Sequence, residues 1–523
     1  MPQPPNESHR IQSAASVVAA ATILSRLLGF VRDAVIAWRF GASLSSDAFF
    51  AAFRIPHLLR RLFAEGALTV TFVPAFTDTL LRQGAGEAAE LAGAAYRLLA
   101  VSLSVFVAVG VVGAAWMVRG MAPGFAPGGE AFTLTVVLTR VMLPYVLFIG
   151  LTALSMGVLN ACGRFAAPAL APVVLNLSII GSVVFLAPHL KAPVLGPAIG
   201  VAAGGVLQLA LQWPWLRRCG MVLRPRGRLG HPALAGIGRR LPPAVIGAAV
   251  FQINVWIDTI LASLLGEGNI SYLYYADRLV QFPLGIVAVA AATAALPSFS
   301  RQAASGDMLS LGRSLYESLR VVMFLTLPAM VGLLVLRRPI VAVLFGRGAF
   351  GPETVDLTAS AVLYYGIGLW AFSGARLVVS AFFAMKDTRI PFAAACAAVV
   401  VNVLFGIVLM KPLGCDGLAL STSLAAAVQF SLLVFAVGRR FDGTGRREWL
   451  LSGMRVLVCA GIMGLAVHLT ASRLAPDGVG MTAGSLAVCV LVGVAVFGAL
   501  SLVWKLPELH TLAGSFRKAG KQP

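Results

Sequence analysis

Long apolar segments recur along almost the whole chain, and they limit its possible folds more than any other feature. A helix needs about 20 residues to cross the hydrocarbon core of a bilayer, and a window of that length finds fourteen candidates. Backbone polar groups in hydrocarbon must pair within their own segment, so spans rich in Ala, Leu and Val are helices. The mean hydropathy of +0.87, with only 12% charged residues, is typical of this class. The sequence therefore predicts an all-α polytopic membrane protein with about 14 transmembrane helices.

The net charge of +20 does not indicate nucleic-acid binding, because the basic residues gather in short loops between the apolar segments. The loop 216–241 carries seven arginines and no acidic residue, and the loop 439–448 and the C-terminal tail are also basic. The intervening loops have few basic residues. Loops rich in Lys and Arg face the cytoplasm, so both termini are predicted to be cytoplasmic. Membrane lipids, not nucleic acids, are the expected partners of these charges.

The sequence gives no sign of an enzyme or of a metal centre. Its six cysteines are scattered, without a CxxC pair or a His/Cys cluster, so we interpret them as packing residues and expect neither a disulfide nor a metal site. The phosphate-binding pattern GxxxxGK[ST] does not occur. We therefore expect no catalytic residue and no cofactor. The first apolar segment carries internal charge and lacks a small-residue cleavage site, so we expect it to be retained.

Matching features recur at nearly one spacing, which indicates two homologous halves. The matches lie 223 to 226 residues apart: Asp33 with Asp258, Pro74 with Pro297, Glu130 with Glu353, and Asn176 with Asn402. We predict six helices in each half, at 13–235 and 236–440. Both halves then begin on one side of the membrane and would enclose a central cavity, opened alternately to its two sides. The other predicted segments are a cytoplasmic tail (1–12), two accessory helices (449–504) and a second cytoplasmic tail (505–523).

Charged residues inside the first apolar segment are the first candidates for a functional site. Arg26, Arg32 and Asp33 lie within the run SRLLGFVRDAVIA. Each charge costs on the order of 3 kcal/mol at mid-bilayer, so such residues face a wet cavity or pair with one another. Arg26 and Asp33 are seven residues apart and share a helical face, whereas Arg32 lies about 120 degrees round the helix. Asp33 could pair with either arginine, so ligand binding and structural ion pairing both stay open.

Two further clusters place charges in comparable settings. HLLRRLFAEG contains His57, Arg60 and Glu65, and YYADRL in the second half contains Asp277 and Arg278. Neighbouring tyrosines, at positions 272, 274 and 275, are typical of the aromatic belt at a membrane interface. Several arginines in one cavity suit a phosphate or pyrophosphate, because the guanidinium fork forms bidentate charge-assisted hydrogen bonds to its oxygens. A cationic drug would be repelled.

Two runs of the sequence closely resemble the MurJ (MviN) family of lipid II flippases. They are SRLLGFVRDAVIAWRFGASLSSDAFFAAFRIPHLLRRLFAEGALTVTFVP and YYADRLVQFPLGIVAVA. That family belongs to the multidrug/oligosaccharidyl-lipid/polysaccharide exporter superfamily. The resemblance implies a protein of the bacterial cytoplasmic membrane that moves undecaprenyl-pyrophosphate-linked disaccharide-pentapeptide to the outer leaflet. It also implies lipid II and cell-wall synthesis proteins as partners of a monomeric transporter.

The resemblance assigns roles to particular residues. The family's cavity arginines fall on Arg26, Arg32, Arg60 and Arg278, and its first-loop carboxylate falls on Asp47. The chain has His57 where the family often has Asn, and Gln281 where it often has Glu, which alters the hydrogen-bond network there. In the family the two accessory helices form a groove for a polyprenyl tail. Three alternatives stay open: a flippase for another polyprenyl-linked glycan, a drug/cation antiporter of the same superfamily, and a scaffold that transports nothing.

Overall fold

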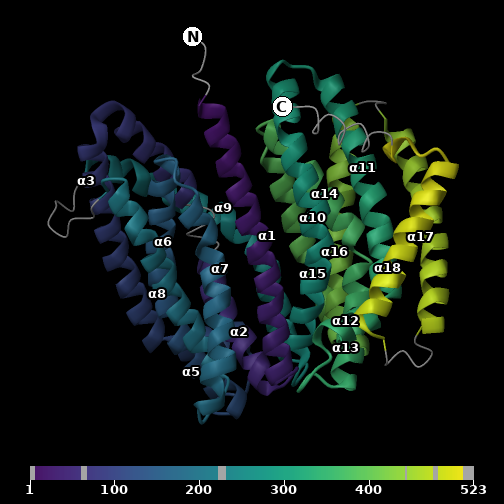
Figure 1. Cartoon of the computed structure of the whole chain (residues 1–523), viewed down its shortest axis with the longest axis horizontal. Coiled ribbons are helices and arrows are strands. Elements are labelled where there is room, and N and C mark those ends of the chain that lie inside the picture. Colours follow the sequence, from purple (N-terminus) through teal and green to yellow (C-terminus); the bar gives the residue numbers. More distant parts are fainter. Residues whose placement is uncertain (1–5, 61–67, 222–230, 442–444, 475–480, 510–523) are drawn as a thin grey trace. The chain divides into compact units, whose positions relative to one another are not determined.

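The computed structural model describes residues 6–60, 68–221, 231–441, 445–474 and 481–509, and every regular element in them is a helix (Figure 1). Ten of these helices are long and apolar enough to cross a membrane. The number is eleven if α13 (Pro352–Gly366) and α14 (Leu369–Ala384), which meet at a bend of 44°, form one broken span. The predicted all-α membrane fold is confirmed. The count of fourteen spans stays a prediction.

The chain divides into two compact units, residues 1–271 and 272–523. They are defined by contacts, so the sequence repeats at 13–235 and 236–440 stay a prediction. Unit 1 contains α1 (Asn6–Phe40), α2 (Leu44–Arg60), α3 (Leu68–Val112), α4 (Ala114–Met121), α5 (Glu130–Met142), α6 (Pro144–Ala161), α7 (Ala166–Gly181), α8 (Leu195–Arg218), α9 (Pro232–Ser263) and the first three residues of α10 (Asn269–Ala304).

Small residues and polar side chains hold the helices of unit 1 together. On α8, a Cβ added to Gly200 would lie 2.9 Å from the backbone Cα of Ile179, so glycine is what permits this approach to α7. The amide of Gln208, also on α8, donates to the Ala171 carbonyl of α7 at 2.8 Å. Lipid supplies little hydrophobic drive for helix association, so close packing and interhelical hydrogen bonds are what membrane helices use instead.

Unit 2 contains most of α10 and all the later helices. They are α11 (Met308–Val335), α12 (Arg337–Phe345), α13, α14, α15 (Arg389–Leu413), α16 (Cys415–Arg440), α17 (Arg446–Leu474) and α18 (Ala483–Val503). The two accessory helices are α17 and α18. Val456 and Met463 of α17 and Phe497 of α18 are buried in the same apolar core as Phe324 of α11. The accessory pair is thus built into the core of unit 2.

A buried ion pair fixes the segment that follows α18. Glu508 is 2% exposed, and its Oε1 accepts hydrogen bonds from Arg320 Nε of α11 at 2.7 Å and from Ser452 Oγ of α17 at 2.6 Å. Glu448 approaches the same guanidinium at 3.6 Å, but its side chain is 75% exposed. Three segments of unit 2 therefore meet at one carboxylate.

Replacing Glu508 with Ala is expected to destabilise unit 2 by about 3 kcal/mol, because removing one partner of a buried ion pair leaves the other charge uncompensated. A lower apparent unfolding temperature of the purified chain would report the loss. Glu448→Ala is the matched control and should leave that temperature unchanged, because exposed ion pairs contribute little. Equal unfolding temperatures for Glu508→Ala and wild type would contradict the assigned role.

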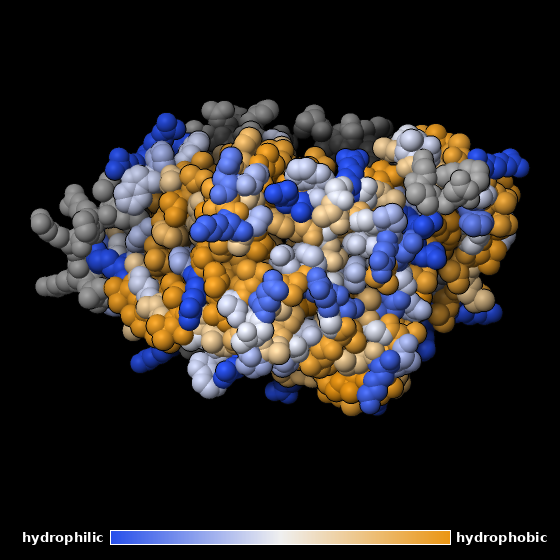
Figure 2. Space-filling view, turned by 90° about the horizontal axis from the view of Figure 1, so that it is seen from below, coloured by the Kyte–Doolittle hydropathy of each residue, from blue (hydrophilic) through white to orange (hydrophobic). Residues whose placement is uncertain are grey.

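The surface is largely apolar. Figure 2 shows hydrophobic side chains over much of the visible face, with hydrophilic side chains scattered between them. Large apolar side chains are exposed along several long helices, among them Val109 of α3, Val408 of α15 and Leu491 of α18. In water such a surface would drive aggregation, whereas in a bilayer it faces lipid.

Candidate functional site: charged clusters within the membrane helices

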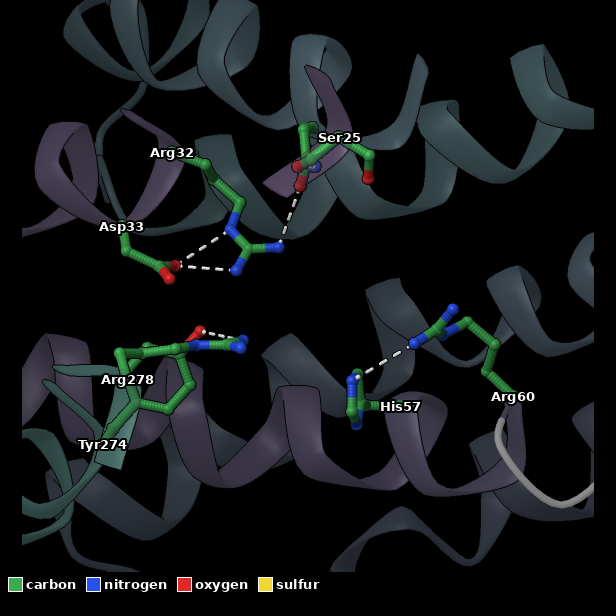
Figure 3. Close-up of polar contacts among 8 residues, drawn as sticks. Ser25, Arg32, Asp33, His57, Arg60, Tyr274 and Arg278 are labelled. Carbon is green, nitrogen blue, oxygen red and sulfur yellow. Dashed lines mark hydrogen bonds and ion pairs between the residues drawn. The ribbon is translucent and has the colours of Figure 1, made fainter. Parts of the chain in front are cut away.

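The charges of the first helix form a buried network. Arg32 and Asp33 are 7% and 2% exposed. Arg32 donates from Nε and Nη2 to Asp33 Oδ1, at 2.9 and 2.7 Å, and from Nη1 to the side-chain oxygen of Asn176 on α7, at 3.0 Å (Figure 3). The Asn176 amide in turn donates to the Ser25 carbonyl at 3.1 Å. This network links α1 to α7 and shares the positive charge between a carboxylate and an amide.

Arg26, in contrast, has an exposed side chain. The seven-residue spacing places it on the same helical face as Asp33, yet the carboxylate pairs with its neighbour Arg32. The physical reason is the length of the arginine side chain, which brings its guanidinium back to the adjacent residue. Asn176 supplies a second acceptor there. Sequence reasoning singled out Asn176 only as one of the repeat matches and did not place it beside Arg32.

Asp47, in the first turn of α2, lies in a second buried cluster. It is 1% exposed, and its Oδ2 accepts from the backbone N–H of Gly268 at 2.6 Å. Its Oδ1 accepts from the backbone N–H and the hydroxyl of Ser271, at 2.8 and 2.6 Å. The first backbone N–H groups of a helix have no partner within that helix, so this carboxylate caps the start of α10.

The capping is reciprocal. Glu267, just before α10, accepts from the backbone N–H of Leu44, the first residue of α2, at 2.7 Å. Asp47 and Ser271 are 224 residues apart, within the spacing of the sequence repeat. The segment before α2 and the segment before α10 thus lie together within unit 1, and each supplies a cap to the helix of the other. Sequence reasoning gave Asp47 a role only through the family resemblance and did not predict this contact.

The second sequence cluster lies at the end of α2. The Nη2 of Arg60 and the Nε2 of His57 are 3.4 Å apart, and both side chains are half-buried (Figure 3). His57 also packs against the ring of Phe53, at 5.8 Å between centroids. Glu65, the third candidate of this cluster, lies outside the described residues.

The third cluster lies on α10, in unit 2. Arg278 donates to the hydroxyl of Tyr274 at 3.0 Å and lies 5.0 Å from the centre of that ring (Figure 3). Asp277 accepts from the side chain of Gln281 at 3.3 Å. Assigning Tyr275 to the interfacial belt is wrong, because this residue is fully buried and packs against Phe350. Its ring fills an aromatic core that only the tertiary fold assembles.

The arrangement brings cationic groups into two units without forming a metal site. Among the described residues, no group of three His, Cys, Asp or Glu side chains could hold a metal ion. The chemistry on offer is hydrogen bonding and charge: Arg32, Arg60 and Arg278 each carry a guanidinium with several N–H donors in a fixed fork. Such groups bind and orient an anion but break no bond.

Buried charge clusters inside membrane helices are typical of proteins that move ions or polar substrates across a membrane, which is the class of membrane transporters. The family model described as lipid II flippase MurJ matches residues 36–488. The chain therefore belongs to the lipid II flippase MurJ family. This confirms the family resemblance predicted from its two characteristic runs.

Individual relatives agree with this assignment. The chain is 39% identical to the lipid II flippase MurJ of Burkholderia cenocepacia, covering 85% of this chain and 88% of that protein. It is 37% identical to a probable lipid II flippase MurJ of Vibrio cholerae, covering 82% of each. A solved lipid II flippase MurJ in an inward closed conformation superposes with a TM-score of 0.79 at 26% identity, covering 93% of this chain and 98% of that one.

More distant structures share the fold alone. An inward-facing multidrug resistance MATE family transporter matches with a TM-score of 0.68 at 16% identity, covering 85% of this chain and 98% of that one. An outward-facing member of that family matches with a TM-score of 0.56 at 18% identity, covering 82% and 96%. This fold therefore occurs in both inward-facing and outward-facing forms.

Proposed function

We propose that this chain is a lipid II flippase that moves undecaprenyl-pyrophosphate-linked disaccharide-pentapeptide from the cytoplasmic to the outer leaflet. Family membership over residues 36–488 is the observation that carries the proposal. The charge of the clusters supports it, because a pyrophosphate needs several hydrogen-bond donors that keep their charge. A drug/cation antiporter is disfavoured for the same reason.

The proposed substrate-binding groups are the arginines of the three clusters and the polar residues around them, of which Asp33 and His57 contact an arginine directly. The arginines are Arg26, Arg32, Arg60 and Arg278, and the supporting residues are Asp33, Asp47, His57, Glu65 and Asp277. Arg26 is an open contact for an anion, because its side chain is exposed within a helix whose Arg32 is buried. Arg32 is held ready by Asp33 and Asn176. Preorganised donors reduce the entropy lost when a ligand binds.

We propose alternating access as the mechanism, with both termini in the cytoplasm. The matching fold exists in inward-facing and outward-facing forms, and the arginine-rich loop 216–241 supports the orientation. The reciprocal caps of α2 and α10 are suited to a reversible closure, because they consist of hydrogen bonds between loops and helix ends. Moving one charge across about 100 mV is worth about 2.3 kcal/mol, which is enough to bias such a transition.

A replacement experiment tests this function. Cells that depend on this chain in place of their own lipid II flippase are expected to grow, and their lipid II should become accessible to a probe added outside. Family membership predicts this result for the wild-type chain. If the inserted protein exposes no lipid II but exposes another polyprenyl-linked glycan, that substrate would replace lipid II. If it exposes neither, the transport proposal fails.

A further inference from the structure

A cavity of about 300 Å³ lies in unit 2, and no residue of the candidate site lines it. Its walls come from α12, from the first turn of α13 and from the residues that begin α18, which lie at one end of the unit (Figure 1). Arg338 and Arg347 supply its charge. This volume is at the lower end of the range for small-molecule sites.

One wall of the cavity is apolar and firmly packed. Phe350, Val355 and Met481 line it and are 2%, 6% and 8% exposed. Phe350 is held from behind by the rings of Phe345 and Tyr275, at 5.8 and 5.3 Å between centroids. The cavity therefore has a rigid apolar wall on one side and two guanidinium groups.

The two arginines differ in their partners. Arg338 forms an ion pair with Asp356 at 2.5 Å, and 38% of its side chain is exposed. Within the described parts of the chain, Arg347 is paired with no carboxylate, and its side chain donates to the Val343 carbonyl at 3.3 Å. Thr482 caps α18 by accepting from the backbone N–H of Ser485. The start of α18 adds the positive end of a helix dipole to the same cavity.

By the predicted sequence repeat, Arg347 and Arg338 have no arginine at the matching positions of the first half. At the spacing of 223 that relates Glu130 to Glu353, Arg347 corresponds to Gly124. A Cβ on Gly124 would lie 2.0 Å from the backbone oxygen of Ser263, so no side chain fits there. Arg338 corresponds in the same way to Ala115. The first half therefore lacks both arginines, and in the second half they lie next to the accessory helix α18.

The position of the cavity favours a lipid as its occupant. The helix α17 begins at Arg446, beside the basic loop 439–448, and α18 returns from its far end, so the cavity lies at the membrane face opposite that loop. By the positive-inside rule, this is the outer face. Leu491 of α18 is 66% exposed, two turns from the cavity, so an apolar surface on which acyl chains can lie begins close to it.

We propose that this cavity binds the phosphate headgroup of an anionic phospholipid of the outer leaflet. Arg347 and Arg338 hold the phosphate diester, the start of α18 donates to it, and the glycerol lies on the wall formed by Phe350, Val355 and Met481. The acyl chains continue along α18. The lipid thereby fastens the accessory pair to α12 and α13 at the outer end of unit 2.

Native mass spectrometry of the purified full chain with added phosphatidylglycerol tests the proposal. Arg347→Ala is expected to weaken retention of this lipid about fivefold, since a basic residue near an anionic lipid contributes roughly 1 kcal/mol. Ala342→Phe, which fills the cavity without changing charge, should weaken it as well. Arg473→Ala is the matched control: this exposed arginine ends α17 and does not line the cavity, so retention should equal wild type.

Two comparison ligands separate the possible sources of the phosphate. Phosphatidylcholine should be retained less than phosphatidylglycerol, and inorganic phosphate at millimolar concentration should not displace the bound lipid. Equal retention of phosphatidylglycerol by wild type, Arg347→Ala and Ala342→Phe would overturn the proposal, and so would displacement by inorganic phosphate. The assay contains no lipid II, so its outcome is independent of the flippase proposal.

Discussion

Replacing Arg32 with Ala is expected to lower the exposure of lipid II at the outer leaflet at least about tenfold, and growth that depends on this chain should stop. A hydrogen bond to a charged group contributes about 1.5–3 kcal/mol, so the loss of one such bond between Arg32 and a pyrophosphate is enough for this change. The measurement is the fraction of lipid II that an external probe reaches, at matched protein levels.

The single variant has a second possible effect. Arg32 neutralises Asp33, which is 2% exposed, and removing one partner of a buried pair costs about 3–5 kcal/mol. The double variant Arg32→Ala/Asp33→Ala removes both charges and should recover the amount of folded protein. We expect it to remain inactive, because the donor for the substrate is still missing. Recovery of flipping by the double variant would mean that Arg32 serves only to neutralise Asp33.

The energetic cost of burying a charge in the membrane identified the charged candidate residues from the sequence. It did not predict which residues they bind. A charge inside an apolar segment is costly wherever the helix lies, so Arg32 and Arg278 are recognisable without a structure. One partner of Arg32 is Asn176, which lies 144 residues further along the chain on another helix. Only packing decides which of several polar residues reaches the guanidinium.

The packing of Tyr275 and of the two accessory helices could not be predicted from the sequence either. Tyrosine is a residue type common in the interfacial belt, yet Tyr275 packs against Phe345 and Phe350. The accessory pair lies outside the repeat, so no internal comparison could say where it packs. The cavity near α18 depends on that packing and was for this reason not predictable. The contact between Asp47 and Ser271 likewise depends on tertiary packing, because a repeat spacing marks two positions as equivalent without bringing them together.

The second large effect is expected at Asp47. Asp47→Ala should abolish growth that depends on this chain, because it leaves the backbone N–H groups of Gly268 and Ser271 without their acceptor. A buried group that loses its hydrogen-bond partner costs about 1–3 kcal/mol. Ser271→Ala should have a milder effect, since the backbone N–H of residue 271 still reaches Asp47. Asp47→Asn should be intermediate, because an amide offers one oxygen in place of two.

Hydrogen exchange separates a local role of Asp47 from a general loss of folding. In Asp47→Ala, the amides of residues 268–271 should exchange at least about tenfold faster, the equivalent of losing about 1.4 kcal/mol of local protection. Glu267→Ala is the matched control: its carboxylate caps Leu44, so faster exchange should appear at the start of α2 instead. Unchanged exchange at Gly268 and Ser271 would contradict the reciprocal caps. Because the caps of α2 and α10 are reciprocal, opening one of them should weaken the other, and the double variant should lose less protection than the two single variants combined.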